Sequence, residues 1–518
     1  MAEFTPIETR YRRIVSDIPH SASDSPLFSQ GGRPIVDELA RLEPRSMAGF
    51  SPVVWQRAEA CNVWDAAGNM WLDFTSGIIL TNAGHAHPAI SEAIRRQIDS
   101  HLLFHYCNPS EVRLNALKAL RSILPPYLDK VFLLSTGGEA VEAAIKLMRT
   151  HGRHLNPAKT HIISYLGAFH GRTLGAQMAG GCLDQHEWIG ERPPGFHHIP
   201  YPDCAFCPWG KSEYQECGEE CLQRSLEPLR GQGIADDLIA GVLTETFPGP
   251  TVAFMPLDYV RALREWTARH QALLVFDEVQ AGFGRTGKWF GFEHYGVEAD
   301  LICMGKGMSS SLPISAVAGR AAIMDLPPHG DMSSTHTGNP LCCAAMMANI
   351  QAIRDEGMVA NAAALGPVAH AALEQLRLRF PGCLGAINGH GLAWGVYVLD
   401  PTTPRSACGT AARELNPGLA TAVIQRCLQL GLLLLPTGGR GTLKVAPPLC
   451  ITREALLEGI HVIEQALSDC TRVQDARSAA VSRSRRDMMR TPSAVSGRRA
   501  GSAFRGGCGS PLSSQRGN

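Results

Sequence analysis

The feature that most constrains the fold is an alternation of short apolar runs with amphipathic stretches between about residues 130 and 325. The apolar runs are VFLLS, HIISYL, LIAGVLTETF, ALLVFDE and ADLICMGKG. Such alternation is typical of parallel strands that are covered by helices. Between two of these runs, residues 139–149 repeat apolar side chains at helical spacing, namely Ala140, Ala143, Ala144 and Leu147. The sequence therefore predicts an α/β fold with a mostly parallel sheet.

The segments on either side of this region predict a second, smaller α+β domain. NVWDAAGNMWLDF indicates a hairpin with an Ala-Gly-Asn turn. Beyond about residue 345 the chain continues with amphipathic helices and short strands. We expect residues 1–79 and 346–472 to build the small domain together, residues 80–345 to form the large domain, and residues 473–518 to form a disordered basic tail.

Charge is unevenly distributed along a chain whose formal net charge is zero. Residues 476–518 hold nine arginines and one acid, Asp487, so the remainder carries eight net negative charges. This tail is rich in Ser and Gly and lacks apolar periodicity, which predicts disorder. It has no interleaved aromatics or RNA-binding signature, which disfavours a nucleic-acid partner.

The sequence predicts a cytoplasmic protein without a membrane partner. No apolar run is long enough to span a bilayer, and the N-terminal segment MAEFTPIETRYRR has no apolar signal core. In a reducing compartment, most of the sixteen cysteines are expected to be small buried hydrophobes. The spacing of one cluster also suits zinc or an iron–sulfur cluster, although loop cysteines without metal are the favoured interpretation: Cys204, Cys207, Cys217 and Cys221.

Open parallel sheets bind ligands at the carboxyl ends of their strands, so the polar residues that follow apolar runs are the first candidates for a site. The first such segment is Ser135-Thr136-Gly137-Gly138-Glu139. Glycines here allow backbone amides to approach an anion, and the following helix adds its positive end. The segment is a candidate phosphate-binding loop, while an ordinary tight turn remains the alternative.

The second segment brings Asp277 to the end of LLVFD, and Lys306 follows 29 residues later between two glycines. A carboxylate keeps a pyridine nitrogen protonated, so that the ring can accept a carbanion's electrons. A desolvated lysine has a lowered pKa and can attack the cofactor aldehyde. The pair therefore predicts a pyridoxal 5'-phosphate (PLP) enzyme, with a surface lysine in a turn as the alternative.

A nucleotide-binding interpretation of the same stretch is disfavoured. Gly282 to Lys288 has the spacing of a phosphate-binding P-loop. However, Trp289 stands where a magnesium-binding Ser or Thr is needed, and the acidic strand precedes the loop.

Six segments in this order resemble the class III PLP-dependent aminotransferases of fold type I, which include 4-aminobutyrate and ornithine aminotransferases. The segments are VWDAAGNMWLDFTSGI, NAGHAHPAI, STGGEAVEAAIKLMR, AFHGRT, FDEVQAGFGRTGKWFGFEHYGVEADLICMGKG and THTGNPLCCAA. The resemblance runs from about residue 50 to 468. It implies a large PLP-binding domain, a smaller α+β domain and a homodimer with shared active sites.

The resemblance also implies roles for individual residues around the cofactor. Lys306 falls on the Schiff-base lysine, Asp277 on the partner of the pyridinium nitrogen, and Gln280 on a residue near the ring oxygen. The other implied cofactor positions are Thr136, Gly137 and Gly138 for the phosphate, Phe169 stacked on the ring with His170 beside it, and Thr335, which reaches the phosphate from the neighbouring subunit.

The implied substrate positions are Ile79, Arg172, Glu245 and Lys444. Lys444 stands where the family usually has an arginine before Ala-Pro-Pro-Leu, and it offers a point charge without the planar fork. The segment ETFPG keeps Glu245 but lacks the family's glutamine. We hypothesise that Arg172 binds a distal carboxylate, while Lys444 pairs with Glu245 and is released for a dicarboxylate acceptor.

The predicted function is transfer of an amino group from an amino acid or amine to a 2-oxo acid, with an omega-amino acid such as 4-aminobutyrate favoured as donor. The alternatives on the same fold are a racemase or epimerase and a dialkylglycine decarboxylase-like enzyme. A catalytically silent scaffold is disfavoured because Lys306 and Asp277 are both present. The histidines His85, His87, His197 and His198 are predicted to be structural.

Overall fold

The structure is a computed structural model that describes residues 32–47, 51, 53–207, 209–211, 217–403 and 414–490. Within these ranges, side chains are described from Pro34 to Arg472. The chain divides into two units between Cys470 and Thr471, and the described residues up to Cys470 form one compact unit. The functional residues predicted from the sequence all lie in this unit.

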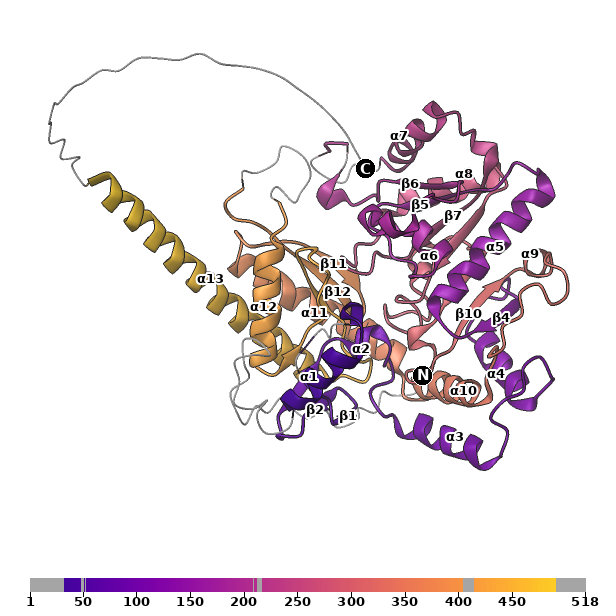
Figure 1. Ribbon diagram of the computed structural model, residues 1–518, viewed down its shortest axis with the longest axis horizontal. Helices are drawn as coiled ribbons and strands as arrows, with labels where there is room; N and C mark the ends of the chain where they lie inside the picture. The colour runs from indigo at the N-terminus through magenta and orange to yellow at the C-terminus, as the bar shows by residue number, and fades with distance from the viewer. Residues whose placement is uncertain are drawn as a thin grey trace, which may run out of the picture. The chain divides into compact units, whose positions relative to one another are not determined.

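The large sheet has seven strands in the order β4-β10-β9-β8-β7-β5-β6 (Figure 1). Its strands are β4 (Lys130–Leu134), β5 (His161–Tyr165), β6 (Phe196–Ile199), β7 (Ile239–Glu245), β8 (Leu273–Asp277), β9 (Leu301–Met304) and β10 (Ser315–Gly319). Strands β9, β8, β7, β5 and β6 are parallel, whereas β10 is antiparallel to both β9 and β4. The predicted α/β fold with a mostly parallel sheet is confirmed.

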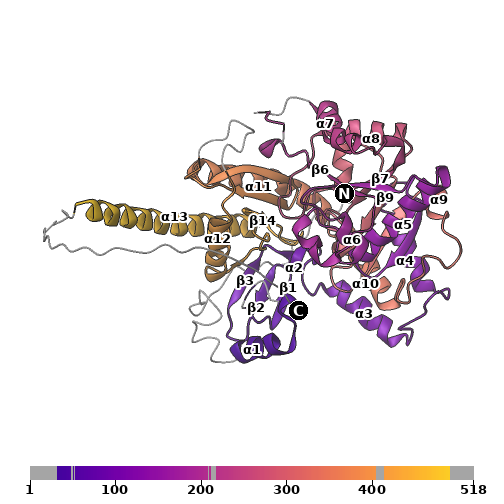
Figure 2. The ribbon, with the colours of Figure 1, turned by 45° about the horizontal axis from the view of Figure 1, so that its top comes forward.

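Helices cover this sheet on both faces, because its strands are apolar on both sides. The helices of this part are α3 (Pro88–Asp99), α4 (Glu111–Arg121), α5 (Gly137–Leu155), α6 (Leu174–Ala179), α7 (Gly218–Gly231), α8 (Leu257–Arg269), α9 (Ala321–Met324) and α10 (Pro340–Asp355). The four residues predicted to form the inner face of α5 are all buried, and they pack with Leu243 and Val275. On the other face, Val242 and Leu274 belong to one core with Leu263 of α8. Figure 2 shows α3 beside α10, which it contacts.

The segments before and after the large sheet share a second sheet in the order β1-β2-β3-β13. Its strands are β1 (Arg57–Glu59), β2 (Asn62–Trp64), β3 (Met70–Asp73) and β13 (Leu432–Leu433). Strands β2 and β3 are antiparallel, as the hairpin prediction requires, and β13 from the C-terminal part joins β3 in parallel. A third sheet contains β11 (Leu384–His390), β12 (Ala393–Val398) and β14 (Thr442–Val445). The domain boundaries proposed near residues 79 and 345 stay a prediction.

The remaining helices are α1 (Gly32–Leu42), α2 (Ser76–Ile79), α11 (Met358–Arg379), α12 (Pro417–Gln429) and α13 (Arg453–Arg490). Helix α13 continues through residues 473–490, which belong to the predicted basic tail. This stretch contains neither proline nor glycine, so nothing in it breaks a helix. Disorder of the tail stays a prediction. The rest of the predicted tail, residues 491–518, lies outside the described residues.

Within the described part of the chain, every helix is too short or too polar to cross a membrane. The cytoplasmic location stays a prediction.

Candidate active site

Three of the predicted site residues lie at or just after the ends of strands that meet at the same edge of the large sheet. Glu245 and Asp277 are register partners at the ends of β7 and β8, and Asp277 in turn pairs with Cys303 of β9. Lys306 follows β9 and begins a short 3-10 helix. The carboxyl ends of the parallel strands thus bring two carboxylates and one amine together, as expected for ligand sites in open α/β sheets.

Asp277 is buried, and protein groups engage both of its carboxylate oxygens. The backbone amide of Val279 donates to Oδ1 over 3.0 Å, and His170 Nδ1 lies 2.9 Å from Oδ2. Only 5% of Asp277 is exposed. These contacts fix the orientation of the carboxylate at the strand end.

Lys306 is half-buried, and its backbone is held in the left-handed region with a φ of 43°. Non-glycine residues rarely adopt this conformation, and such strain concentrates at functional sites. Desolvation lowers the pKa of the Lys306 amine, although the negative charges of Asp277 and Glu245 oppose the shift. A lowered pKa gives the lysine a larger neutral, nucleophilic fraction.

The candidate phosphate-binding loop begins α5. Thr136 caps the helix and forms a reciprocal capping box with Glu139. The amides of Gly137 and Gly138 occupy the first two helical positions, and neither has a hydrogen-bond partner among the described residues. Both can therefore donate to an anion at the positive end of the helix.

Other segments of the same chain approach this loop closely, which favours glycine there. A Cβ at Gly137 would lie 3.0 Å from Cγ1 of Val279. A Cβ at Gly171, next to His170, would lie 3.0 Å from the Gly138 Cα. Val279 and Ser315 were missed by the sequence analysis; the Ser315 hydroxyl holds the loop by donating to the Thr136 carbonyl over 2.7 Å. Val279 lies inside the quoted FDEVQ segment, whereas nothing in the sequence distinguishes Ser315.

The predicted pair between Lys444 and Glu245 is not formed. Glu245 accepts hydrogen bonds from the amides of Phe169, over 2.9 Å, and Gly249, over 3.0 Å. Lys444 Nζ instead donates to Oε1 of Gln280, over 2.8 Å, and to the carbonyl of Gly249. The backbone of Gly249 therefore links Glu245 and Lys444. Its amide donates to the Glu245 carboxylate, and its carbonyl accepts from the Lys444 amine.

Burial shifts both of these groups toward their neutral forms. Desolvation raises the pKa of Glu245 to about 7. Desolvation, together with the nearby Lys306, lowers the pKa of Lys444 to about 7. Near neutral pH, each group is therefore poised between its charged and neutral forms.

Ile79 is not available as a substrate wall. Only 1% of it is exposed, and it packs in a small core with Leu435 and Ala446. Its neighbour Ile78 is 41% exposed. Residues 76–79 are all left-handed, with φ between 46° and 72°, so the usual relation between sequence position and side-chain direction is lost.

Arg172 lies at the exposed side of the site. Its guanidinium carbon is 5.5 Å from the centroid of the Phe169 ring, and it has no hydrogen bond or ion pair with any described residue. Phe169 itself is 38% exposed. An unpaired guanidinium beside an exposed aromatic ring is able to receive a carboxylate.

The sequence profile of the family described as "Aminotransferase class-III" matches residues 45–467. The chain belongs to the class-III aminotransferase family. The chain is 34% identical over 443 residues to the "Leucine/methionine racemase" of Thermococcus litoralis, covering 84% of this chain and 95% of that protein. It is 32% identical over 448 residues to the "Diaminobutyrate--2-oxoglutarate aminotransferase" of Haemophilus influenzae, covering 85% and 94%.

Among solved structures, this class-III chain is similar to the PLP-bound form of an amine transaminase from an uncultivated Pseudomonas species. The TM-score is 0.73 and the identity 25%, over 83% of this chain and 98% of that chain. The cofactor of this class-III enzyme is PLP. Its residues fit the cofactor, since unpaired amides begin α5, the Asp277 carboxylate is fixed by two hydrogen bonds, and Lys306 follows the neighbouring strand.

Thr335 of this class-III chain lies on a loop and not at the carboxyl edge of the large sheet, where Asp277 and Lys306 meet. It is exposed in the loop before α10. That loop packs against residues 103–105, since Asn339 Nδ2 donates to the Leu103 carbonyl and the rings of Phe104 and His336 lie 5.9 Å apart. An exposed threonine on this loop fits the expectation that it serves a neighbouring subunit, which stays a prediction.

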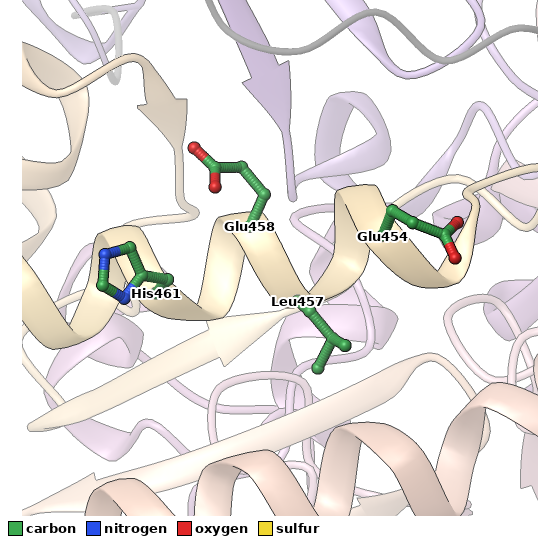
Figure 3. Close-up of a pocket in the computed structure, with 4 residues that line it drawn as sticks. All are labelled: Glu454, Leu457, Glu458 and His461. Atoms are coloured by element: carbon green, nitrogen blue, oxygen red, sulfur yellow. The ribbon is translucent and has the colours of Figure 1, made fainter.

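The four clustered cysteines line one pocket together with Tyr259 of α8. Burial raises the pKa of Cys204 to about 12 and that of Cys221 to about 11, so these thiols are neutral. Within the described ranges, no group of three or more His, Cys, Asp or Glu side chains is arranged to hold a metal. Another hollow, drawn in Figure 3, carries Glu454, Leu457, Glu458 and His461, all from α13. It contains none of the predicted site residues.

Three of the four histidines predicted to be structural are hydrogen-bonded to other side chains. His85 contacts Asp73 over 2.7 Å, His87 contacts Glu356 over 2.9 Å, and His197 contacts His161 over 2.7 Å. His198 differs because its Nε2 is buried without a hydrogen-bond partner among the described residues.

Proposed function

We propose that this class-III enzyme transfers the amino group of an omega-amino acid to a 2-oxo acid, with Arg172 binding the distal carboxylate of the donor. The observation that carries the proposal is the unpaired, exposed guanidinium of Arg172 beside the Phe169 ring. An ionic hydrogen bond there holds the donor's far end while its amine faces Lys306.

In this proposal, each residue has a defined part in the reaction. PLP supplies an electron sink that stabilises negative charge on the substrate carbon. Lys306 holds the cofactor and, once released, moves a proton from the substrate carbon as general base and then acid. Asp277 keeps the ring nitrogen protonated, and the Gly137 and Gly138 amides hold the phosphate.

Mixing the PLP-loaded protein with a panel of amines and amino acids tests the proposal. A donor converts the cofactor to its amine form and shifts the visible absorbance, whatever the acceptor is. We expect 4-aminobutyrate-like donors to react faster than simple alkyl amines. Equal reaction with donors that have and lack a distal carboxylate would contradict it.

Racemisation is the second candidate, because the chain is 34% identical to a leucine/methionine racemase. Incubating the enzyme with L-leucine or L-methionine, without any 2-oxo acid, separates the two functions. A racemase accumulates the D-enantiomer over many turnovers, whereas an aminotransferase stops after the first half-reaction, with one 2-oxo acid product per active site.

We expect Arg172→Ala to lower kcat/KM for omega-amino acid donors by about tenfold to hundredfold, since one charge-assisted hydrogen bond contributes roughly 1.5 to 3 kcal/mol. Steady-state kinetics with 4-aminobutyrate measure the effect. Simple amines serve as the internal control and should react as with the parent enzyme. An equal loss for both donor types would mean that Arg172 acts on the cofactor or the fold.

The lowered pKa of Lys444 predicts that the KM for dicarboxylate acceptors depends on pH. Its pKa is lowered to about 7, so its cation is present below this pH and is lost as the pH rises through it. We expect KM for 2-oxoglutarate to rise across this interval, while KM for pyruvate, which has no second carboxylate, stays flat. Lys444→Ala should remove the difference, and Lys444→Arg should make 2-oxoglutarate binding independent of pH in this range. Parallel pH profiles for both acceptors in the parent enzyme would refute this role.

We propose a homodimer in which Thr335 completes the site of the partner subunit. Exposed apolar side chains surround its loop, namely Leu102, Leu103, Phe104 and Tyr106. Such a patch marks an interface. We expect light scattering to give a dimer mass, and Phe104→Glu to give monomers with weakened PLP binding. Leu378→Glu is the control, because Leu378 is 61% exposed on α11, outside this patch. A monomeric parent would contradict the proposal.

A further inference from the structure

Behind Asp277, a chain of buried polar groups leads away from the cofactor side. His170 Nδ1 contacts the Asp277 carboxylate over 2.9 Å, and His170 Nε2 lies 3.3 Å from the Ser164 hydroxyl. Only 3% of His170 and 1% of Ser164 are exposed. Ser164 lies on β5, so the chain connects the ends of two strands of the large sheet.

Both imidazole nitrogens of His170 are thus engaged by protein groups, and no polar atom of the ring remains for the cofactor. Its two contacts fit a neutral ring with the proton on Nδ1. In this tautomer, Nδ1 donates to Asp277 and Nε2 accepts from the Ser164 hydroxyl.

We propose that His170 and Ser164 are positioning residues that keep Asp277 ionised and aimed at the ring nitrogen of PLP. Ser164 fixes the tautomer of His170, and His170 supplies the hydrogen bond that stabilises the anionic carboxylate. The inference rests on the proposed role of Asp277 and replaces direct cofactor binding as the task of His170.

The charged and titratable groups around His170 agree with this arrangement. Glu245 on β7 is the second carboxylate near the ring, and amides from Phe169 and Gly249 hold it separately. His198, the register neighbour of Ser164 on β6, is the nearby imidazole. Among these groups, Ser164 is the hydroxyl whose hydrogen bond selects the His170 tautomer.

The test loads the full-length enzyme with PLP labelled with nitrogen-15 in its ring and reads ring protonation from the nitrogen chemical shift. His170→Phe fills the same volume without a donor, and we expect its ring nitrogen to lose protonation while PLP dissociates about tenfold to hundredfold more readily. His170→Asn keeps a donor near the place of Nδ1 and should retain the parent shift. Ser164→Ala should give a shift between these two.

His186→Phe is the matched control, because His186 is also buried but its Nε2 has no hydrogen-bond partner among the described residues. It should leave the shift unchanged. A parent-like shift in a folded His170→Phe enzyme would overturn the proposal. If His170→Phe does not fold, Ser164→Ala provides the test. A parent-like nitrogen chemical shift in Ser164→Ala would show that Ser164 does not act through the His170 tautomer and would overturn the proposal. A parent enzyme that binds no PLP would instead refute the cofactor site itself.

Discussion

Lys306→Ala is expected to abolish covalent attachment of PLP and to lower turnover by roughly a hundredfold to ten-thousandfold, the contribution of a positioned general acid and base. Lys306 is the amine that directly follows β9 at the carboxyl edge of the sheet. The chain has only eight lysines. Borohydride reduction of the holoenzyme, followed by peptide mass mapping, measures the attachment.

Lys444 provides the matched control for this experiment. Lys444 is buried and close enough to Lys306 for their charges to interact, but it already donates to Gln280 and to the Gly249 carbonyl. Lys444→Ala should therefore retain the reducible linkage at Lys306. A reducible adduct in the Lys306→Ala protein, on Lys444 or elsewhere, would disprove the assignment.

Asp277→Asn is expected to retain PLP and lose most of its activity, by about tenfold to hundredfold or more. The amide can still accept from the Val279 backbone, but it carries no charge to keep the ring nitrogen protonated. Absorbance and kinetics of the same preparation measure both effects. Asp300→Asn removes a carboxylate that pairs with Arg264 instead, and it should leave turnover unchanged. Near-parental turnover in Asp277→Asn would refute the electronic role.

The residues that follow apolar strands were predictable from the sequence. Asp277 and Lys306 close runs of residues that fit only buried strands, and Gly137 and Gly138 lie between such a strand and a helix with clear periodicity. In an open α/β sheet this local order fixes the position in space, because parallel strands end at one edge. The chemistry of the site follows from the order of these motifs.

Side-chain direction outside regular elements was not predictable. Ile79 was proposed as the substrate wall, but four consecutive left-handed residues turn it into the core and leave Ile78 exposed. A β-branched residue rarely has positive φ, so nothing in its sequence indicates such a turn. The antiparallel direction of β10 was also not predictable, because an apolar run contains no information on strand direction.

The cofactor chemistry was predictable because the types and order of Asp277, Lys306 and the glycine pair are local properties of the chain. The hydrogen-bond partners of the site residues, in contrast, depend on how the chain folds. Lys444 contacts Gln280 instead of Glu245, and His170 contacts Asp277 and Ser164. His170 and Asp277 are 107 residues apart in the sequence, and Lys444 and Gln280 are 164 residues apart. The packing of separate strands brings these side chains together in space. The number of residues between them in the sequence does not predict that contact.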